Sequence, residues 1–144
     1  MKRKKLSSIC MFLLTLVFLF VLGTKGHHLT AIEKSEIEGE WKGAQPGQDV
    51  TFIFEGDTVK MNSPVPNYNY SGTFTLDTGA DPKRIDLDIK ESGIPAYKGR
   101  TFKGIYKIEG DILTLALNQP GVSLYPSSFE VMSGAMVFVL KKQD

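Results

Sequence analysis

Apolar and polar residues alternate along most of the chain after Gly39. The clearest run is residues 85–89, in which Ile, Leu and Ile are separated by Asp86 and Asp88. Side chains of a β-strand point alternately to the two faces of a sheet, so this period of two predicts strands that are buried on one face only. Comparable runs occupy residues 50–55, 59–61, 70–76, 102–108, 113–117 and 136–140.

Turns that contain glycine separate several of these runs. Glu55-Gly56-Asp57 and Glu109-Gly110-Asp111 each lie between two alternating segments, and glycine supplies the positive φ of a tight hairpin. With residues 39–42 as the first strand and 133–142 as the last, the chain holds about eight strands at the spacing typical of a sandwich or barrel. We therefore predict an all-β fold, a small antiparallel meander barrel, because closure removes exposed strand edges.

Three segments interrupt the alternation. Residues 29–38 can form a short helical turn, but no longer helical periodicity develops there. Residues 62–69 include two prolines, and residues 118–128 form a second long connection. Long loops on a rigid barrel often carry function, so these two loops are candidate functional segments.

The N-terminal segment has the pattern of an export signal. Lys2, Arg3, Lys4 and Lys5 are followed by 19 uncharged residues, 6–24. This pattern predicts a signal peptide or an N-terminal membrane anchor over residues 1–26, and both alternatives stay open because neither plausible cleavage site is Ala-x-Ala. The basic end stays in the cytoplasm, so the remainder is expected to be extracytoplasmic: secreted, periplasmic or anchored facing outside. Residues 27–38 then form a short lead-in and residues 39–144 the barrel, with membrane contact only through the N-terminal segment.

Charge and composition exclude several classes of function. Without residues 1–26 the chain keeps 12 basic and 16 acidic residues, a net charge of −4, which argues against a nucleic-acid partner. Cys10 lies in the leader, so the hydrophobic core must stabilise the domain without disulfides. The two histidines, His27 and His28, lie at the start of the mature chain, and we expect no metal site and no cofactor.

Several motifs resemble a family of small extracytoplasmic bacterial domains of unknown function that is frequent in planctomycetes. They are Gly39-x-Trp41, Asp81-Pro-Lys-Arg-Ile-Asp-Leu87, Lys103-Gly-Ile-Tyr-Lys-Ile-Glu-Gly-Asp-Ile-Leu113 and Pro126-x-x-Phe129. The resemblance covers residues 39–142 and implies a lipocalin-like barrel without an established activity. The family has arginine where this chain has Tyr125, so the role of that arginine is not carried over.

Gly39-x-Trp41 also resembles the first-strand signature of lipocalins. That resemblance implies that the indole closes one end of the barrel beneath a basic side chain of the last strand. Lys141 or Lys142 is expected to provide this cation–π contact.

Aromatic residues are the main functional candidates. Those expected on the inner face, with Trp41, are candidate ligand-binding residues: Trp41, Phe52, Phe54, Phe74, Phe102, Tyr106 and Phe138. Such side chains either line a pocket or fill the interior of a small barrel. Two functions therefore remain open. One is an exported lipocalin-like domain that binds a small apolar ligand; the other is a structural or protein-interaction domain of the cell envelope with a filled core.

The sequence predicts no enzymatic activity and no catalytic residue. Asp77-Thr78-Gly79 resembles the active-site loop of retropepsin-like aspartic proteases, which is kept as a minor alternative. That chemistry requires two such aspartates that share a proton, but the chain contains a single Asp-Thr-Gly. The same residues suit a hairpin turn. Asp86 and Asp88 alternate with apolar residues and are expected on the solvent face.

Overall fold

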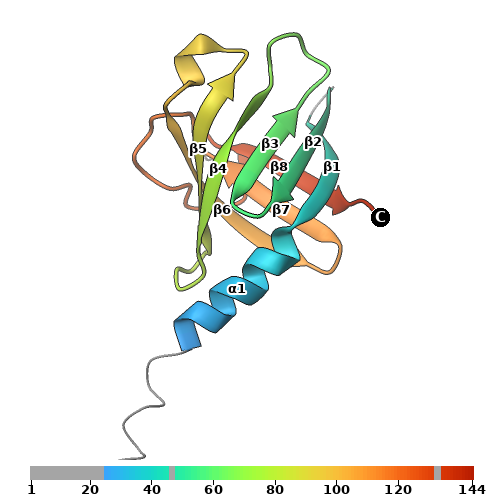
Figure 1. Ribbon diagram of the computed structural model, residues 1–144. Coiled ribbons are helices and arrows are strands. Elements are labelled where there is room, and N and C mark those ends of the chain that lie inside the picture. Colours follow the sequence, from blue (N-terminus) through green and yellow to red (C-terminus); the bar gives the residue numbers. More distant parts are fainter. Residues whose placement is uncertain (1–24, 46–47, 132–133) are drawn as a thin grey trace, which may run out of the picture.

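The computed structural model describes residues 25–45, 48–131 and 134–144. One α-helix, eight strands and a short 3₁₀ helix follow one another along the chain (Figure 1). They are α1 (Lys25–Ile37), β1 (Gly39–Gln45), β2 (Gln48–Glu55), β3 (Thr58–Asn62), β4 (Tyr70–Asp77), β5 (Arg84–Ser92), η1 (Pro95–Tyr97), β6 (Thr101–Glu109), β7 (Ile112–Leu117) and β8 (Met136–Lys142).

The strands form a closed antiparallel barrel in which each strand pairs with the next. β8 closes the barrel by pairing with β1, where Trp41 faces Lys142 and Lys42 faces Lys141. This arrangement confirms the predicted all-β fold, a small antiparallel meander barrel. Each of the eight strands therefore has a paired neighbour on both sides, which limits aggregation through exposed edges.

The core lies inside the barrel and follows from the alternation of the sequence. In β5, Ile85, Leu87 and Ile89 are buried, whereas Asp86 and Asp88 between them are partly accessible. The interior side chains from all eight strands form one apolar cluster. Burial of this surface is the main favourable contribution to folding, because the described chain has no cysteine and hence no cross-link.

The two ends of the barrel differ in their connections. At the end that carries α1, tight turns join β2 to β3 and β6 to β7, and the connection 78–83 joins β4 to β5 (Figure 1). Gly56 and Gly110 have φ of 58° and 64° in the two tight turns, which confirms the predicted hairpin glycines. The longer connections 63–69, 93–100 and the one that begins at residue 118 leave the opposite end, which we call the loop end.

Helix α1 is longer than the short turn that the sequence predicts, with 13 residues. Its last turn packs on the barrel, because Ile37 is fully buried and joins the core cluster. Ion pairs of Glu33 with Lys83 and of Lys34 with Asp57 attach the helix to two turns of the barrel. These tertiary contacts stabilise a helix whose own periodicity is poor.

No described helix is long and apolar enough to cross a membrane. Most of the predicted signal or anchor segment, residues 1–24, lies outside the described residues.

Candidate functional site

The structure brings the seven candidate ligand-binding residues together inside the barrel. All seven side chains are buried, with exposed fractions of 0% for Trp41 and Phe52, 1% for Phe54, Phe102, Tyr106 and Phe138, and 3% for Phe74. They come from β1, β2, β4, β6 and β8, so the antiparallel closure of the barrel is what makes them neighbours.

Ring-to-ring packing occupies the space between these side chains. The ring centroids of Phe52 and Phe138 are 5.1 Å apart in an edge-to-face arrangement, and those of Phe54 and Phe74 are also 5.1 Å apart. A ligand cavity would leave its lining side chains accessible to water, whereas these are 0–3% exposed. The packing therefore favours an interior that is filled by side chains over one that is lined by them.

Trp41 closes the end of the barrel that carries α1. Its indole N–H donates to the carbonyl of Ile37 at 2.6 Å, and the Lys142 Nζ lies 5.1 Å from the ring centroid. The Lys142 ammonium also donates to the carbonyl of Glu36 at 3.0 Å. The predicted cation–π contact is thus confirmed for Lys142. Lys141 instead lies 3.8 Å from Asp111 on the outer surface.

Tyr106 is buried beneath α1, and its hydroxyl has no hydrogen-bond partner among the described residues. Burial raises the pKa of this hydroxyl above its ordinary value, and the nearby negative charge of Glu33 raises it further. The hydroxyl therefore stays protonated at neutral pH, so it cannot act as a general base there.

Tyrosines pack into the loop end of the barrel. Tyr70 is 5% exposed and stacks on Phe102 with ring centroids 5.1 Å apart, while Tyr97 meets Phe102 edge to face at 5.7 Å. The Tyr68 hydroxyl donates to the Met136 sulfur at 3.3 Å. Tyr68 and Tyr97 pack as partly buried residues against the core, so they cover the loop end and do not rim an open mouth.

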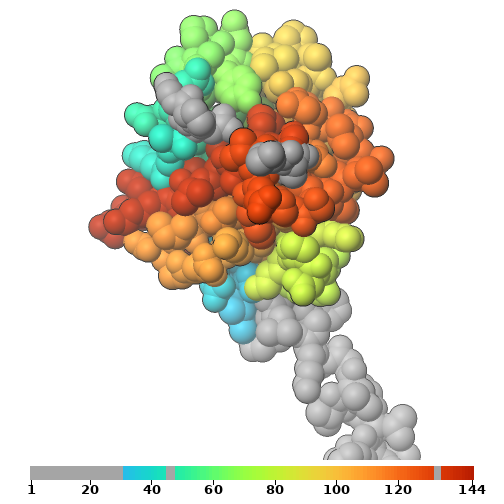
Figure 2. Space-filling model, turned by 180° about the vertical axis from the view of Figure 1, so that it is seen from behind, coloured from blue at the N-terminus to red at the C-terminus, as the bar shows by residue number. Residues whose placement is uncertain are grey.

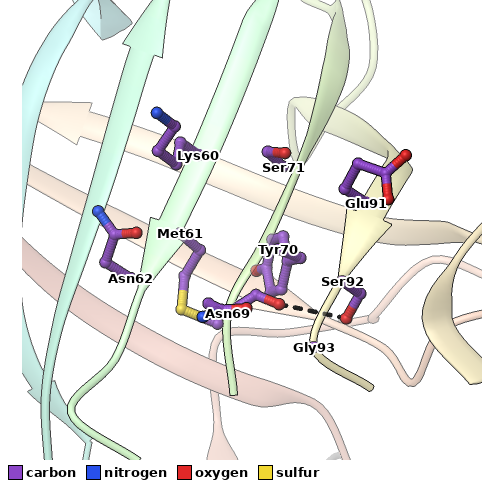
Figure 3. Close-up of a pocket in the computed structure, with 9 residues that line it drawn as sticks. All are labelled: Lys60, Met61, Asn62, Asn69, Tyr70, Ser71, Glu91, Ser92 and Gly93. Atoms are coloured by element: carbon purple, nitrogen blue, oxygen red, sulfur yellow. Dashed lines mark hydrogen bonds between the residues drawn. The ribbon is translucent and has the colours of Figure 1, made fainter. Parts of the chain in front are cut away.

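A shallow groove of about 340 Å³ lies beside the loop end on the outside of the barrel (Figure 3). Its lining residues are Lys60, Met61, Asn62, Asn69, Tyr70, Ser71, Glu91, Ser92 and Gly93. The sequence analysis did not identify this site, because its residues come from three strands and the connections beside them, and their polar side chains look like an ordinary solvent face.

A second apolar cluster lies on the outside of the barrel, over β6, β7 and β8. Loop 118–131, which follows β7, places Tyr125 and Phe129 against outward-facing Ile105, Ala116 and Val137. Figure 2 shows this segment in orange on the right of the barrel as seen from behind. The loop is therefore packed on the barrel wall and does not extend freely into solvent.

Polar contacts attach the same loop to β5 and β6. The Tyr125 hydroxyl donates to Asp86 Oδ1 at 2.9 Å, and Lys103 Nζ donates to Asp86 Oδ2 at 2.5 Å. The hydrogen bond to Asp86 raises the pKa of Lys103, and Tyr125 adds to the effect. Arg84 stacks over the Tyr125 ring at 4.4 Å from its centroid. Asp86 was expected only to face solvent, but the structure gives it this clamping role.

Exposed apolar side chains are concentrated on loop 118–131. Val122, Leu124 and Val131 are 40%, 73% and 74% exposed, and they are three of the five large apolar side chains that are exposed in the described part of the chain. The other two, Ile32 and Val139, lie on α1 and β8.

The Asp-Thr-Gly segment forms the turn between β4 and β5. Asp77 Oδ1 accepts a hydrogen bond from the backbone N–H of Gly79 at 3.1 Å, and Asp77 is exposed. The carboxylate thus caps its own turn, as aspartates commonly do. No group of three or more potential metal-ligating side chains occurs among the described residues.

No protein family model, curated protein or solved structure matches this chain. The resemblance of residues 39–142 to the planctomycete-type family stays a prediction.

Proposed function

We propose that this chain is an extracytoplasmic interaction domain with a filled barrel, which binds another protein of the cell envelope through loop 118–131. The observation that carries the proposal is the burial of all seven interior candidate residues at 0–3% exposure. With the interior occupied by side chains, the outer surface is the part of the domain that supports recognition.

The exposed apolar side chains of loop 118–131 support its role as the contact surface. Leu124 and Val131 leave most of their surface in water, and with Val122 they make up most of the large apolar side chains exposed in the described part of the chain. Exposed apolar side chains that are concentrated on one surface segment are typical of a protein-binding surface.

The fixed position of the loop also supports this role. Tyr125 is held by Asp86 through its hydroxyl, and the Asn118 side chain donates to the carbonyl of Leu124 at 2.8 Å. The Gly121 N–H donates to the carbonyl of Thr101 at 3.0 Å. A preorganised loop loses little conformational entropy when a partner binds, so its exposed side chains contribute more to affinity.

The position of α1 is consistent with a contact surface on loop 118–131. The predicted leader precedes α1, so an anchored chain would hold the α1 end towards the membrane and the loop end away from it. Loop 118–131 begins at the loop end, where a partner has access.

Site-specific photo-crosslinking in intact cells tests the proposal. Val131 is replaced by the photoreactive amino acid benzoylphenylalanine, and Ile32 on α1 is replaced in a matched control. We expect a discrete adduct from position 131 alone, and we expect Leu124→Asp in the same chain to abolish it.

Native mass spectrometry of the protein purified from its own envelope tests the alternative function. A small apolar molecule that is released on denaturation would contradict the filled interior.

In the photo-crosslinking experiment, equal adducts from positions 131 and 32, or an adduct that survives Leu124→Asp, would contradict the role of the loop.

A further inference from the structure

The groove beside the loop end is built on the barrel wall from three neighbouring strands. Lys60 pairs with Ser71, and Ser71 pairs with Glu91, so these residues form one row across β3, β4 and β5. Figure 3 shows the small Ser71 side chain between the longer side chains of Lys60 and Glu91. The outer two residues are separated by two strand spacings, about 10 Å, and the short side chain between them leaves a hollow.

Four polar side chains of the groove have no partner among the described residues. Lys60, Asn62, Asn69 and Ser71 form no side-chain hydrogen bond or ion pair with another described residue, although all four line the same hollow. The carbonyl of Asn69 is occupied, since it accepts from the Ser92 hydroxyl at 3.2 Å (Figure 3). The free groups are one ammonium, two primary amides and one hydroxyl, a set that is rich in hydrogen-bond donors.

The charge of the groove is also unbalanced. Glu91 is paired with Lys98 at 3.0 Å, so its negative charge is compensated from outside the row. Lys60 has no such partner among the described residues and leaves an excess of positive charge in the groove. A ligand carboxylate beside Lys60 would form a charge-assisted hydrogen bond, which is stronger than a neutral one.

We propose that this groove binds an acidic oligosaccharide, in which a carboxylate lies against Lys60 and hydroxyl groups bond to Asn62, Asn69 and Ser71. Primary amides and hydroxyls both donate and accept, as sugar hydroxyls do, so they match a polyol better than an apolar ligand. The open form of the hollow suits a segment of a chain better than an enclosed small molecule. The proposal does not depend on loop 118–131, because none of the groove residues belongs to that loop.

Two probes, one with free carboxylates and one with the carboxylates esterified, separate the parts of the proposal. They are tetragalacturonic acid and its methyl ester. The protein is expressed with its own N-terminal segment and purified after export, and each probe is titrated into it in a calorimeter. We expect the acid to bind at least about tenfold more tightly than the ester. Lys60→Gln should weaken binding of the acid about tenfold and leave that of the ester unchanged, because only the charge-assisted contact is lost.

Variants of the groove wall locate the binding. Ser71→Trp fills the hollow and should abolish binding of both probes, whereas Thr75→Trp on the outer face of the same strand should not change it. Asn62→Ala gives a milder second test, with a loss of about threefold to tenfold, if circular dichroism shows that Ser71→Trp does not fold. Absence of binding by the acid, equal affinity for acid and ester, or binding that persists in a folded Ser71→Trp variant would overturn the proposal.

Discussion

Phe52→Ala tests whether the barrel interior is filled by its side chains. Phe52 is fully buried, and its ring centroid lies 5.1 Å from that of Phe138, 6.2 Å from Phe54 and 6.3 Å from Tyr70. Truncation in a close-packed core removes the transfer free energy of the ring and leaves a cavity that rigid strands cannot collapse. We expect the free energy of unfolding to fall by about 4 kcal/mol, in the middle of the range for buried phenylalanine.

Urea unfolding followed by the fluorescence of Trp41 measures this change. Trp41 is the single tryptophan of the chain and is fully buried, so its emission reports loss of the core. For a domain of this size the expected loss corresponds to a fall in the urea midpoint of about 2 M. Phe129→Ala is the matched control, because Phe129 is only partly buried in the outer cluster, and it should cost about 1–2 kcal/mol.

The cavity itself provides the decisive comparison. An apolar cavity of this kind stays dry and takes up a small apolar molecule, so benzene should stabilise Phe52→Ala and leave the unsubstituted protein unaffected. A loss below about 1 kcal/mol in the variant, or stabilisation of the unsubstituted protein by benzene, would refute the filled interior. Either result would favour the binding of a small apolar ligand over the interaction domain with a filled core.

Two further predictions concern the contacts of Asp86 with Tyr125 and Lys103 and the buried tyrosines. Asp86→Ala removes the hydrogen-bond acceptor of both Lys103 and Tyr125. We expect the free energy of unfolding to fall by about 1–2 kcal/mol and proteolytic cleavage within loop 118–131 to become faster. The control Asp88→Ala should leave the cleavage rate unchanged. Burial raises the pKa of Tyr70 well above its ordinary value and also raises that of Tyr106, so above about pH 10 the unfolded chain loses these protons before the folded one does. The free energy of unfolding should therefore be insensitive to these groups below about pH 9 and should fall as the pH rises above about 10, as measured by urea titrations at each pH. The fall should become shallower in Tyr70→Phe; an unchanged slope in that variant would contradict the assignment.

The sequence alone determines which side of each strand is buried. In β5 the alternation of Ile85, Asp86 and Leu87 needs no tertiary information, because the direction of a side chain in a strand depends only on its position along the strand. The same holds for the turns at Gly56 and Gly110, where a positive φ is a local requirement. Together these local rules predict eight antiparallel strands in a meander.

Only the tertiary structure decides whether the interior is open or filled. A phenylalanine such as Phe52 or Phe74 has the same sequence pattern in a pocket wall as in a core. The difference lies in the volume enclosed by the barrel and in the register that places Phe52 beside Phe138, residues 86 positions apart in the chain. Packing of this kind depends on cross-barrel neighbours, about which the period of two carries no information.

The contacts on the outer surface likewise cannot be predicted from the sequence alone. The sequence predicts that Asp86 faces solvent, but it cannot show that Tyr125 and Lys103 converge on that carboxylate from a distant loop and a neighbouring strand. It likewise contains Lys60, Ser71 and Glu91 as three unremarkable polar residues, and strand pairing alone places them in one row. The direction of a side chain is a local property of the backbone, whereas its partners depend on strand register and loop packing, which form only when distant segments meet.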